Sequence, residues 1–461
     1  MQGDKIIKEI EEHRDKLWDL EQKIWKQPEG ALHEEKAAAW TASLLEEAGF
    51  QVERGIYGLS TAFRAVWGEG KPAIGFLGEY DALPGLAQSV STEKEEIEGQ
   101  AWGHGCCHNL LGMAAAAAAI GLKAELEQNK AKGSVIYYGC PAEETLKGKP
   151  VMAARGAFRD LDAVIANHPA YSTEVSYGTT QGCRGFIVRF HGTPSHAGLS
   201  PELGRSALDA LELANVGINF LREHVADDVR MSYIINQGGQ AANIVPDYAE
   251  GTYTVRALDS ARIDDAFERV KNIMEGAALM TGTKCEVEET GGCYPILNNP
   301  TLVELVHSCM EELEGEMEPY TEEELAFAEK ISETMPEESV RRKEKAYGVT
   351  KENPMQFGVR PVGIYDIPGG FDVGDVSHIV PTAFFQNTAY PPGLVAHTWQ
   401  VTACAGHPMA FKGSVYAAKV MALAGLKLIE NSELMEQAKA AFESQMTGKS
   451  YHSYCHDLKE G

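Results

Sequence analysis

The chain has 461 residues, of which 44% are hydrophobic and 23% charged, the proportions of a globular protein with enough apolar material for two or three domains. Its formal net charge is −26, from 67 acidic and 41 basic residues. A surface this acidic repels nucleic acid and anionic membranes, so we exclude both as partners, whereas a small site sets its own local potential and can still take an anionic substrate.

The compartment is predicted from apolar runs and cysteines. Residues 1–27 are charged throughout and lack the apolar segment of a signal peptide. The longest apolar stretch, residues 112–122, falls well short of the ~18 residues of a membrane span. Nine scattered cysteines, an odd number, fit a reducing compartment better than a disulfide framework. The sequence therefore predicts a cytoplasmic protein.

The first part of the chain alternates helices with short apolar strands. Residues 6–24 carry apolar side chains at helical spacing, and Gly49 ends the second helix. The predicted helices are residues 6–24, 33–48, 110–127 and 149–156, and the predicted strands are residues 50–53, 61–67, 72–77, 134–138 and 162–167. This alternation predicts an α/β fold with a mixed sheet flanked by helices.

The pattern changes near residue 185, where strands and helices follow in the order βαββαβ of a ferredoxin-like unit. The elements are strand 185–192, helix 206–224, strands 230–237 and 250–257, helix 261–280 and strand 284–289. We interpret residues 185–292 as an inserted domain, and residues 1–184 and 293–461 as the catalytic domain that it interrupts.

The last part of the chain returns to α/β character and is predicted to end in a helix at residues 412–429. Residues 311–345 are dense in glutamate and poor in aromatic side chains. They predict a solvated helical insertion, and a flap that shapes specificity is the alternative.

The first candidate metal motif is Cys106-x-His108, at the predicted start of a helix. A thiolate and an imidazole two residues apart can reach one ion from a tight turn, and zinc and related ions accept sulfur and nitrogen ligands. By itself, the same pair is also compatible with a buried cysteine beside a histidine that is satisfied by hydrogen bonds.

The second motif is the adjacent pair Glu143 and Glu144, which follows the strand at residues 134–138. Open α/β sheets place their sites at the carboxyl ends of strands. In one plausible arrangement Glu144 binds a metal while Glu143 acts as general base on water, a division of labour suited to amide hydrolysis. The alternative is a solvated acidic pair at a helix N-terminus.

Three further motifs also follow strands or begin loops. His168 ends a strand, His397 lies in a loop after two prolines, and Glu79 and Asp81 follow the strand at residues 72–77. These carboxylates could bind a metal or orient a ligand histidine, and each motif alone is compatible with a core histidine, a solvated loop histidine or a turn aspartate. Together the motifs predict one shared metal site with the ligands Cys106, His108, Glu144, His168 and His397.

Seven ordered motifs extend over nearly the whole chain: GEYDALPG, GHGCCHNLLG, PAEE, NHP, GTPSHAG, GGQAANIVPD and DVGDVS…HTW. In this order they resemble the metallopeptidase family of aminoacylases, glutamate carboxypeptidases and auxin-conjugate amidohydrolases, and within it the branch that holds the B-type subunit of p-aminobenzoyl-glutamate hydrolase. The resemblance implies a catalytic α/β domain interrupted by a lid domain that dimerises.

The resemblance also implies roles for single residues. The positions of the family's ligands match Cys106, His108, Glu144, His168 and His397. Glu143 matches the general base, and Asn243 matches a lid residue near the substrate. His196 matches a lid histidine that reaches the partner subunit's site, where it would stabilise the tetrahedral oxyanion.

Two positions depart from the family pattern. Cys107 stands where this branch usually has glycine, and Glu79 stands where more distant relatives carry a metal-binding histidine. The resemblance therefore implies a cofactor of one or two divalent metal ions. Zinc and manganese are the metals expected first.

The function expected from these features is metal-dependent hydrolysis of the amide bond of N-acyl or N-aroyl amino acids, such as p-aminobenzoyl-glutamate. The alternatives are a dipeptidase of the same family and a non-catalytic partner subunit. An intact Glu143 beside five intact ligands argues against the last. The expected partners are a small amide substrate and a second copy of the chain, bound through the lid domain. The need for a second type of hydrolase subunit is left open.

Overall fold

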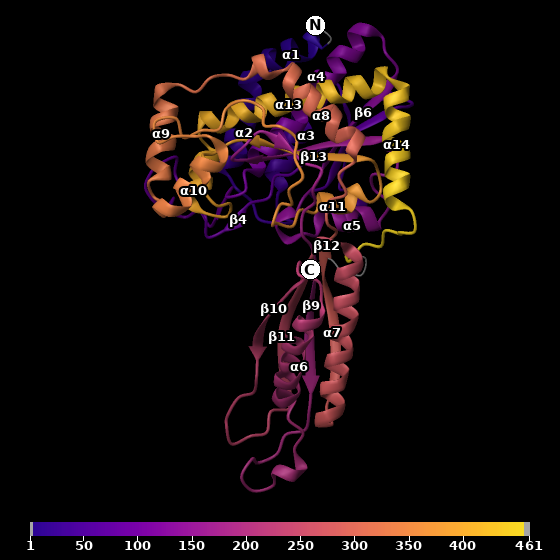
Figure 1. The fold of residues 1–461 in the computed structure, drawn as a ribbon, viewed down its shortest axis with the longest axis vertical. Coiled ribbons are helices and arrows are strands. Elements are labelled where there is room, and N and C mark those ends of the chain that lie inside the picture. The colour runs from indigo at the N-terminus through magenta and orange to yellow at the C-terminus, as the bar shows by residue number, and fades with distance from the viewer. Residues whose placement is uncertain (1–2, 456–461) are drawn as a thin grey trace. The chain divides into compact units, whose positions relative to one another are not determined.

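The computed structural model describes residues 3–455, and these form two compact units (Figure 1). The larger comprises the described residues up to Gly178, together with Leu297–Tyr365 and Val376–Tyr451. The smaller comprises Thr179–Ile296, Asp366–Asp375 and the described residues from His452 on. The smaller unit thus extends beyond the interval 185–292 at both ends and takes up two further segments.

A seven-stranded mixed sheet forms the centre of the larger unit, which confirms the predicted α/β class. Its strands, in spatial order, are β1 (Gln51–Arg54), β2 (Phe63–Glu69), β6 (Gly133–Gly139), β3 (Ala73–Gly78), β7 (Ala163–Ala170), β13 (Thr382–Thr388) and β8 (Glu174–Val175). The four strands from β6 to β13 are parallel and completely buried, whereas the outer pairings are antiparallel. Continuous apolar runs such as AIGFLG in β3 are typical of parallel strands covered on both faces.

Two long helices, α4 (His108–Asn129) and α13 (Pro408–Glu430), pack against each other and against the parallel strands. The run Ala114–Ala119 is buried, and such small side chains let α4 lie close to its neighbours. By length and composition α4 could cross a membrane, but it is buried inside the larger unit, as the core helix of a globular protein is. The remaining helices of this unit are α1 (Asp4–Glu12), α2 (Arg14–Lys26), α3 (Glu35–Glu47), α5 (Gly148–Ala154), α8 (Pro300–Glu312), α9 (Glu322–Ser332), α10 (Glu337–Tyr347), α12 (Trp399–Ala405) and α14 (Ser432–Met446).

The structure corrects two predicted elements. The single opening helix is divided at His13 into α1 and α2. The helix at residues 412–429 does not end the fold, because α14 follows it after Asn431, whose side chain caps α14 by accepting the N–H of Leu434. The apolar spacing continues across both breaks, so periodicity alone did not reveal them.

The smaller unit has the order β9 (Gly182–His191), α6 (Ala207–Leu221), β10 (Arg230–Gln237), β11 (Tyr248–Ala257), α7 (Ser260–Thr281) and β12 (Lys284–Cys293). Its antiparallel sheet has the spatial order β10-β11-β9-β12, so β10 is an edge strand. Alternate residues of β11 are buried, because only one face of the sheet is covered by α6 and α7. This is the βαββαβ arrangement that the sequence predicts.

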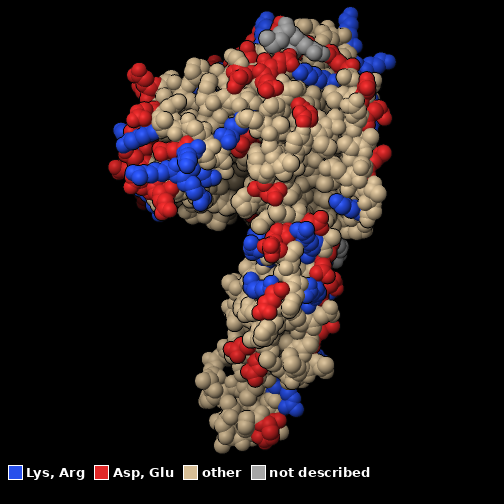
Figure 2. All heavy atoms as spheres, in the orientation of Figure 1, with Lys and Arg blue, Asp and Glu red and all other residues tan. Residues whose placement is uncertain are grey.

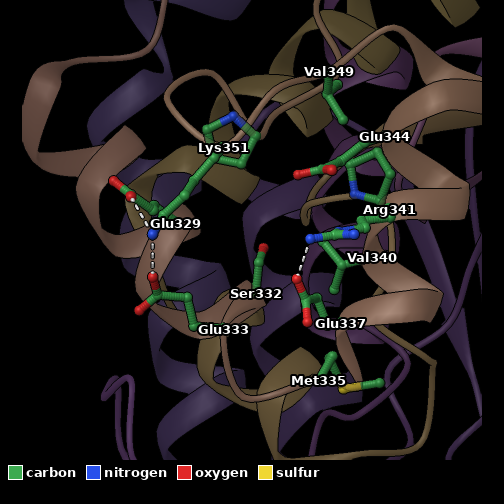
Figure 3. Close-up of a pocket in the computed structure, with 12 residues that line it drawn as sticks. Glu329, Ser332, Glu333, Met335, Glu337, Val340, Arg341, Glu344, Val349 and Lys351 are labelled. Atoms are coloured by element: carbon green, nitrogen blue, oxygen red, sulfur yellow. Dashed lines mark hydrogen bonds and ion pairs between the residues drawn. The ribbon is translucent and has the colours of Figure 1, made fainter.

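The acidic stretch at residues 311–345 is largely helical, and α9 and α10 lie side by side (Figure 1). Acidic and basic side chains intermix over these helices (Figure 2). They border a cavity of about 390 Å³, where Lys351 pairs with Glu333 at 2.7 Å and Arg341 pairs with Glu337 (Figure 3). The charges lining this cavity are thus largely paired with one another, as expected of a solvated helical insertion.

Candidate metal centre

The candidate metal donors lie at or near the carboxyl ends of the four parallel strands. Glu79 follows β3, the short 3-10 helix η2 (Glu143–Thr145) follows β6, and His168 lies near the end of β7. The loop after β13 carries His397, and α4 begins at His108. Because the ends of parallel strands meet at one edge of a sheet, these side chains converge.

The first group of converging side chains consists of Cys106, His108 and His168, whose donor atoms lie within 4.8 Å of one another. The Cys106 Sγ lies 3.5 Å from the His168 Nε2. Between the first two residues, Cys107 has a φ of +62°, in the left-handed region that favours glycine. Glycine adopts this backbone without strain, whereas Cys107 adopts it with a side chain, which is completely buried.

A second group joins Cys106 to Glu144 and His397. The Glu144 Oε2 lies 3.3 Å from the His397 Nε2. The backbone N–H of His397 donates to the carbonyl oxygen of Gly105 at 2.8 Å, which holds the distant loop beside the Cys106 turn. The His397 side chain is 54% exposed, so this edge of the centre is open to a ligand.

A third group consists of Glu79, His108 and Glu143. The His108 Nε2 lies 3.3 Å from the Glu79 Oε2 and 3.7 Å from the Glu143 Oε2. Since Cys106 and His108 each belong to two of the three groups, the donors could hold two neighbouring ions as well as one.

Asp81 orients this centre without belonging to any of the three groups. Its Oδ1 lies 2.9 Å from the His108 Nδ1, and its Oδ2 accepts the backbone N–H of Glu144 at 2.8 Å. Burial favours protonation of Asp81, but the hydrogen bond with His108 outweighs it and holds the pKa of that carboxyl below its ordinary value. With its Nδ1 engaged, His108 turns its Nε2 toward the other donors, as a carboxylate behind a ligand histidine does.

The pKa shifts of His168 and His397 suit metal binding, whereas the Asp81 carboxylate outweighs burial and raises the pKa of His108, from which a cation would have to displace a proton. Burial and the nearby His108 lower the pKa of His168 to about 4, and the same two causes lower the pKa of His397. Both imidazoles are therefore neutral at pH 7, as ligands must be. Burial and the Glu144 carboxylate raise the pKa of Cys106 to about 12, so the reactive thiolate forms there only when a cation displaces the proton.

The donor set fits a divalent transition metal. The Glu79 Oε2 and the His108 Nε2 are buried and have no hydrogen-bond partner among the described residues. A bound cation would satisfy both atoms at once. Sulfur, nitrogen and carboxylate donors together suit zinc and related ions.

Sequence reasoning missed two buried charged residues at this centre. Lys149, in α5, pairs with Glu79 at 2.5 Å, and Glu34, just before α3, accepts the backbone N–H of Ala142 at 2.8 Å. Lysine and glutamate near helix starts are usually exposed, and neither residue lies in a ligand motif. Glu34 cannot be told apart from the adjacent Glu35 in the sequence, because both have the same side chain.

His196 and Asn243 lie in the smaller unit, and the structure brings them side by side. An antiparallel bridge pairs His196 with Ile244, and the N–H of Ala197 donates to the carbonyl oxygen of Asn243 at 3.0 Å. The His196 Nδ1 accepts the N–H groups of Gly198 and Leu199, each at 3.1 Å. In the neutral ring the proton then lies on Nε2, which makes that nitrogen of the exposed His196 a hydrogen-bond donor.

Comparisons with known proteins show what this chain is similar to. A family model for peptidase family M20/M25/M40 matches residues 75–352. The chain is 37% identical to the B-type subunit of p-aminobenzoyl-glutamate hydrolase from Escherichia coli (strain K12), covering 96% of this chain and 95% of that one. It is 30% identical to the Xaa-Arg dipeptidase of Mus musculus, covering 95% and 91%. The fold resembles that of the Bacillus subtilis YXEP protein, a dinuclear metal binding peptidase, with a TM-score of 0.61 at 18% identity over 91% of this chain and 99% of that one.

Proposed function

The chain belongs to peptidase family M20/M25/M40 and is a hydrolase of that family, and on this premise we propose that it cleaves the amide bond of N-acyl or N-aroyl amino acids of the p-aminobenzoyl-glutamate kind. The observation that carries the proposal is the placement of Glu143 beside His108 within the group of metal donors. The 37% identity to one subunit of a p-aminobenzoyl-glutamate hydrolase, over nearly the whole chain, supports this substrate class.

The positions of the side chains support the mechanism that we propose. Cys106, His108, Glu144, His168 and His397 would hold a divalent ion, which would supply Lewis acidity toward the substrate carbonyl. Glu143, buried at the same centre, takes a proton from the attacking water as the bond from its oxygen to the carbonyl carbon forms. When the C–N bond breaks, Glu143 returns this proton to the leaving nitrogen.

A dipeptidase activity is the second candidate, and the 30% identity to an Xaa-Arg dipeptidase favours it. Acyl-glutamates, aroyl-glutamates and dipeptides assayed side by side, each with zinc and with manganese, separate the two candidates. We expect the highest kcat/KM for the aroyl-glutamates. Preference for dipeptides would replace the first proposal with the second, and hydrolysis of neither class would overturn both.

Substitution of the general base tests the mechanism. We expect Glu143→Gln to keep its metal, because the ligands remain, and to lose kcat by at least ~10²-fold, the scale of general-base catalysis. Chelation of the metal should abolish turnover in the wild type, and Cys106→Ala should lose metal. Near-normal turnover of Glu143→Gln would require another base.

We also infer that the protein is a cytoplasmic homodimer, with zinc or manganese as its cofactor. Its nine cysteines are all free thiols, which supports a reducing compartment. Two apolar side chains of the edge strand β10, Ile234 and Ile235, are 64% and 47% exposed, and Phe220 on α6 is 67% exposed. Pairing of two β10 strands across a two-fold axis would cover them. The Escherichia coli relative is itself named as one subunit of a hydrolase, which supports a second subunit type as a further partner.

The roles proposed for His196 and Asn243 rest on this dimer. The Nδ1 of His196 accepts two hydrogen bonds, so its Nε2–H would donate a hydrogen bond to the oxyanion that develops in the partner subunit's site. Asn243, beside it, would bind the substrate.

A further inference from the structure

Lys149 is a lysine buried against the metal centre. Its side chain has no exposed surface, and its Nζ lies 2.5 Å from the Oε1 of Glu79, which is 8% exposed. Lysine is almost never buried unless it is paired, and a buried pair gives up the hydration of both charges. The position therefore needs a reason beyond the stability of the fold.

The chain before Lys149 directs it inward. A Cβ added at Gly148 would lie 1.6 Å from the carbonyl oxygen of Pro141, so only glycine lets the start of α5 pack onto the turn before Glu143. This close contact places the next residue, Lys149, beside the candidate metal centre.

Glu79 links Lys149 to the donors. Its Oε1 contacts the ammonium group, while its Oε2 lies 3.3 Å from the His108 Nε2 and has no hydrogen-bond partner within residues 3–455. The donor atoms of Glu79, His108 and Glu143 lie within 4.8 Å of one another. The ammonium is thus one carboxylate away from the position of a metal ion.

The formal charges of the buried centre indicate that the Lys149 ammonium contributes to its charge balance. Counted in their ionised forms, five groups of the centre are negative: Glu79, Asp81, Glu143, Glu144 and the Cys106 thiolate. One divalent ion together with Lys149 leaves two negative charges unbalanced, whereas two divalent ions together with Lys149 bring the sum to zero. Unbalanced charge in a buried site is costly, so this charge set is matched to two ions.

We propose that Lys149 is a fixed positive charge of the metal centre that balances the Glu79 carboxylate. Through Glu79, it sets how many divalent ions the centre retains and how tightly it binds them. Lys149 is a positioning residue, because it touches Glu79 rather than the substrate. The inference rests on the proposed function only in requiring a metal, and it can be tested without any substrate.

The test measures metal content in Glu79→Gln, Lys149→Met and the double variant. Each protein is loaded with Zn²⁺ and dialysed, its zinc equivalents are measured by atomic emission, and its affinity for the weaker ion is obtained by competition with a chromogenic chelator. We expect two equivalents in the wild type. Glu79→Gln removes the negative charge that the ammonium contacts, so the weaker ion should bind at least about tenfold less tightly. Removal of the ammonium as well, in the double variant, should restore most of that affinity.

A second buried pair provides the matched control. Lys412 and Glu324 are 2.7 Å apart and 8% and 7% exposed, and they belong to none of the three donor groups. Glu324→Gln should therefore leave the zinc equivalents unchanged. Thermal unfolding checks that each variant folds. If Lys149→Met does not fold, the comparison of Glu79→Gln with the double variant still tests the inference.

Two outcomes would overturn the inference: unchanged zinc affinity in Glu79→Gln, or a double variant that binds zinc no better than Glu79→Gln does. The second would mean that Lys149 only packs against Glu79. A wild type that shows the expected zinc pattern but hydrolyses no amide would overturn the proposed function and support this inference.

Discussion

At the scale of single residues, Glu34 shows how one buried carboxylate can shape the turn that carries the proposed general base. Its Oε1 accepts the N–H groups of Ala142 at 2.8 Å and Leu32 at 2.9 Å, and its Oε2 accepts the hydroxyl of Thr61 at 2.9 Å. Ala142 has a φ of +58°, which is strained for a residue with a side chain, and it immediately precedes Glu143. Glu34 therefore fixes the backbone from which Glu143, the proposed general base, extends.

We predict that Glu34→Ala lowers kcat by roughly 10–100-fold with little change in KM, because small misplacements of a catalytic group have effects of this size. Glu34→Gln should retain most of the activity, since its amide oxygen can accept the same N–H groups. Steady-state kinetics on both variants measure this, with Glu35→Ala, at the exposed neighbouring position, as the control. Equal losses in the Ala and Gln variants would mean that the charge of Glu34, rather than its hydrogen bonds, matters.

The metal donors could be proposed from the sequence because each follows a strand or begins a loop, and the topology of a parallel sheet brings such positions together. The residues that orient these donors could not be predicted from the sequence. Burial raises the pKa of Glu34 to about 7, and the nearby Asp81 adds to this effect. The burial itself depends on tertiary packing. The sequence cannot show it, because the exposed Glu35 next to Glu34 has the same side chain. Lys149 was missed for the same reason: its depth is set by the contact of Gly148 with Pro141.

At the scale of elements, the contact between β3 and α4 sets the spacing between two of the donors. A Cβ added at Gly112 would lie 2.4 Å from the carbonyl oxygen of Glu79. Glycine thus lets α4, which begins at His108, lie directly against the end of β3. The distance between the side chains of Glu79 and His108 depends on this close approach.

We predict that Gly112→Ala destabilises the protein by about 1–3 kcal/mol, the usual effect of overpacking, and weakens zinc retention by separating Glu79 from His108. Denaturant unfolding and metal analysis measure the two effects. Gly276→Ala is the control: it lies within α7 with no atom within 4 Å of an added Cβ, so it should stabilise its helix by up to about 1 kcal/mol. Full zinc affinity in Gly112→Ala would show that the centre tolerates movement of α4.

The elements themselves differed in how well they could be predicted. The parallel strands β3 and β6 are continuous apolar runs between helices, so both were predicted. The strand β13 was not, because Gln386 and Asn387 interrupt its apolar run, although both are buried. Their burial depends on partners distant in sequence, such as Asn167, whose side chain donates to the Asn387 Oδ1 at 2.8 Å.

At the scale of the whole molecule, the residues proposed for catalysis are divided between two units. Glu143 and the metal donors lie in the larger unit, and His196 and Asn243 lie in the smaller. The order of elements in the smaller unit followed from the sequence pattern. Association between copies of the chain could not be read from residue spacing, because exposed apolar residues such as Ile234 acquire meaning only once β10 is known to be an edge strand.

The proposed sharing of the active site between two subunits predicts complementation. His196→Ala and Glu143→Gln should each be nearly inactive as homodimers, the first through loss of an oxyanion donor worth ~3 kcal/mol and the second through loss of the base. In a mixed dimer, one of the two sites combines a wild-type Glu143 with a wild-type His196 from the opposite chain. Mixed dimers prepared by co-expression with two different affinity tags should therefore recover up to about half of the wild-type activity.

The control is a mixed dimer of two differently tagged Glu143→Gln chains, which has no intact base and should stay inactive. Measurement of mass in solution must show that the doubly purified species is a dimer. If His196 acted within its own chain, neither site of the mixed dimer would be complete, because each chain lacks one of the two residues. Confirmed mixed dimers without recovered activity would therefore overturn the shared site, whereas recovered activity would place His196 and Glu143 of opposite chains at one substrate.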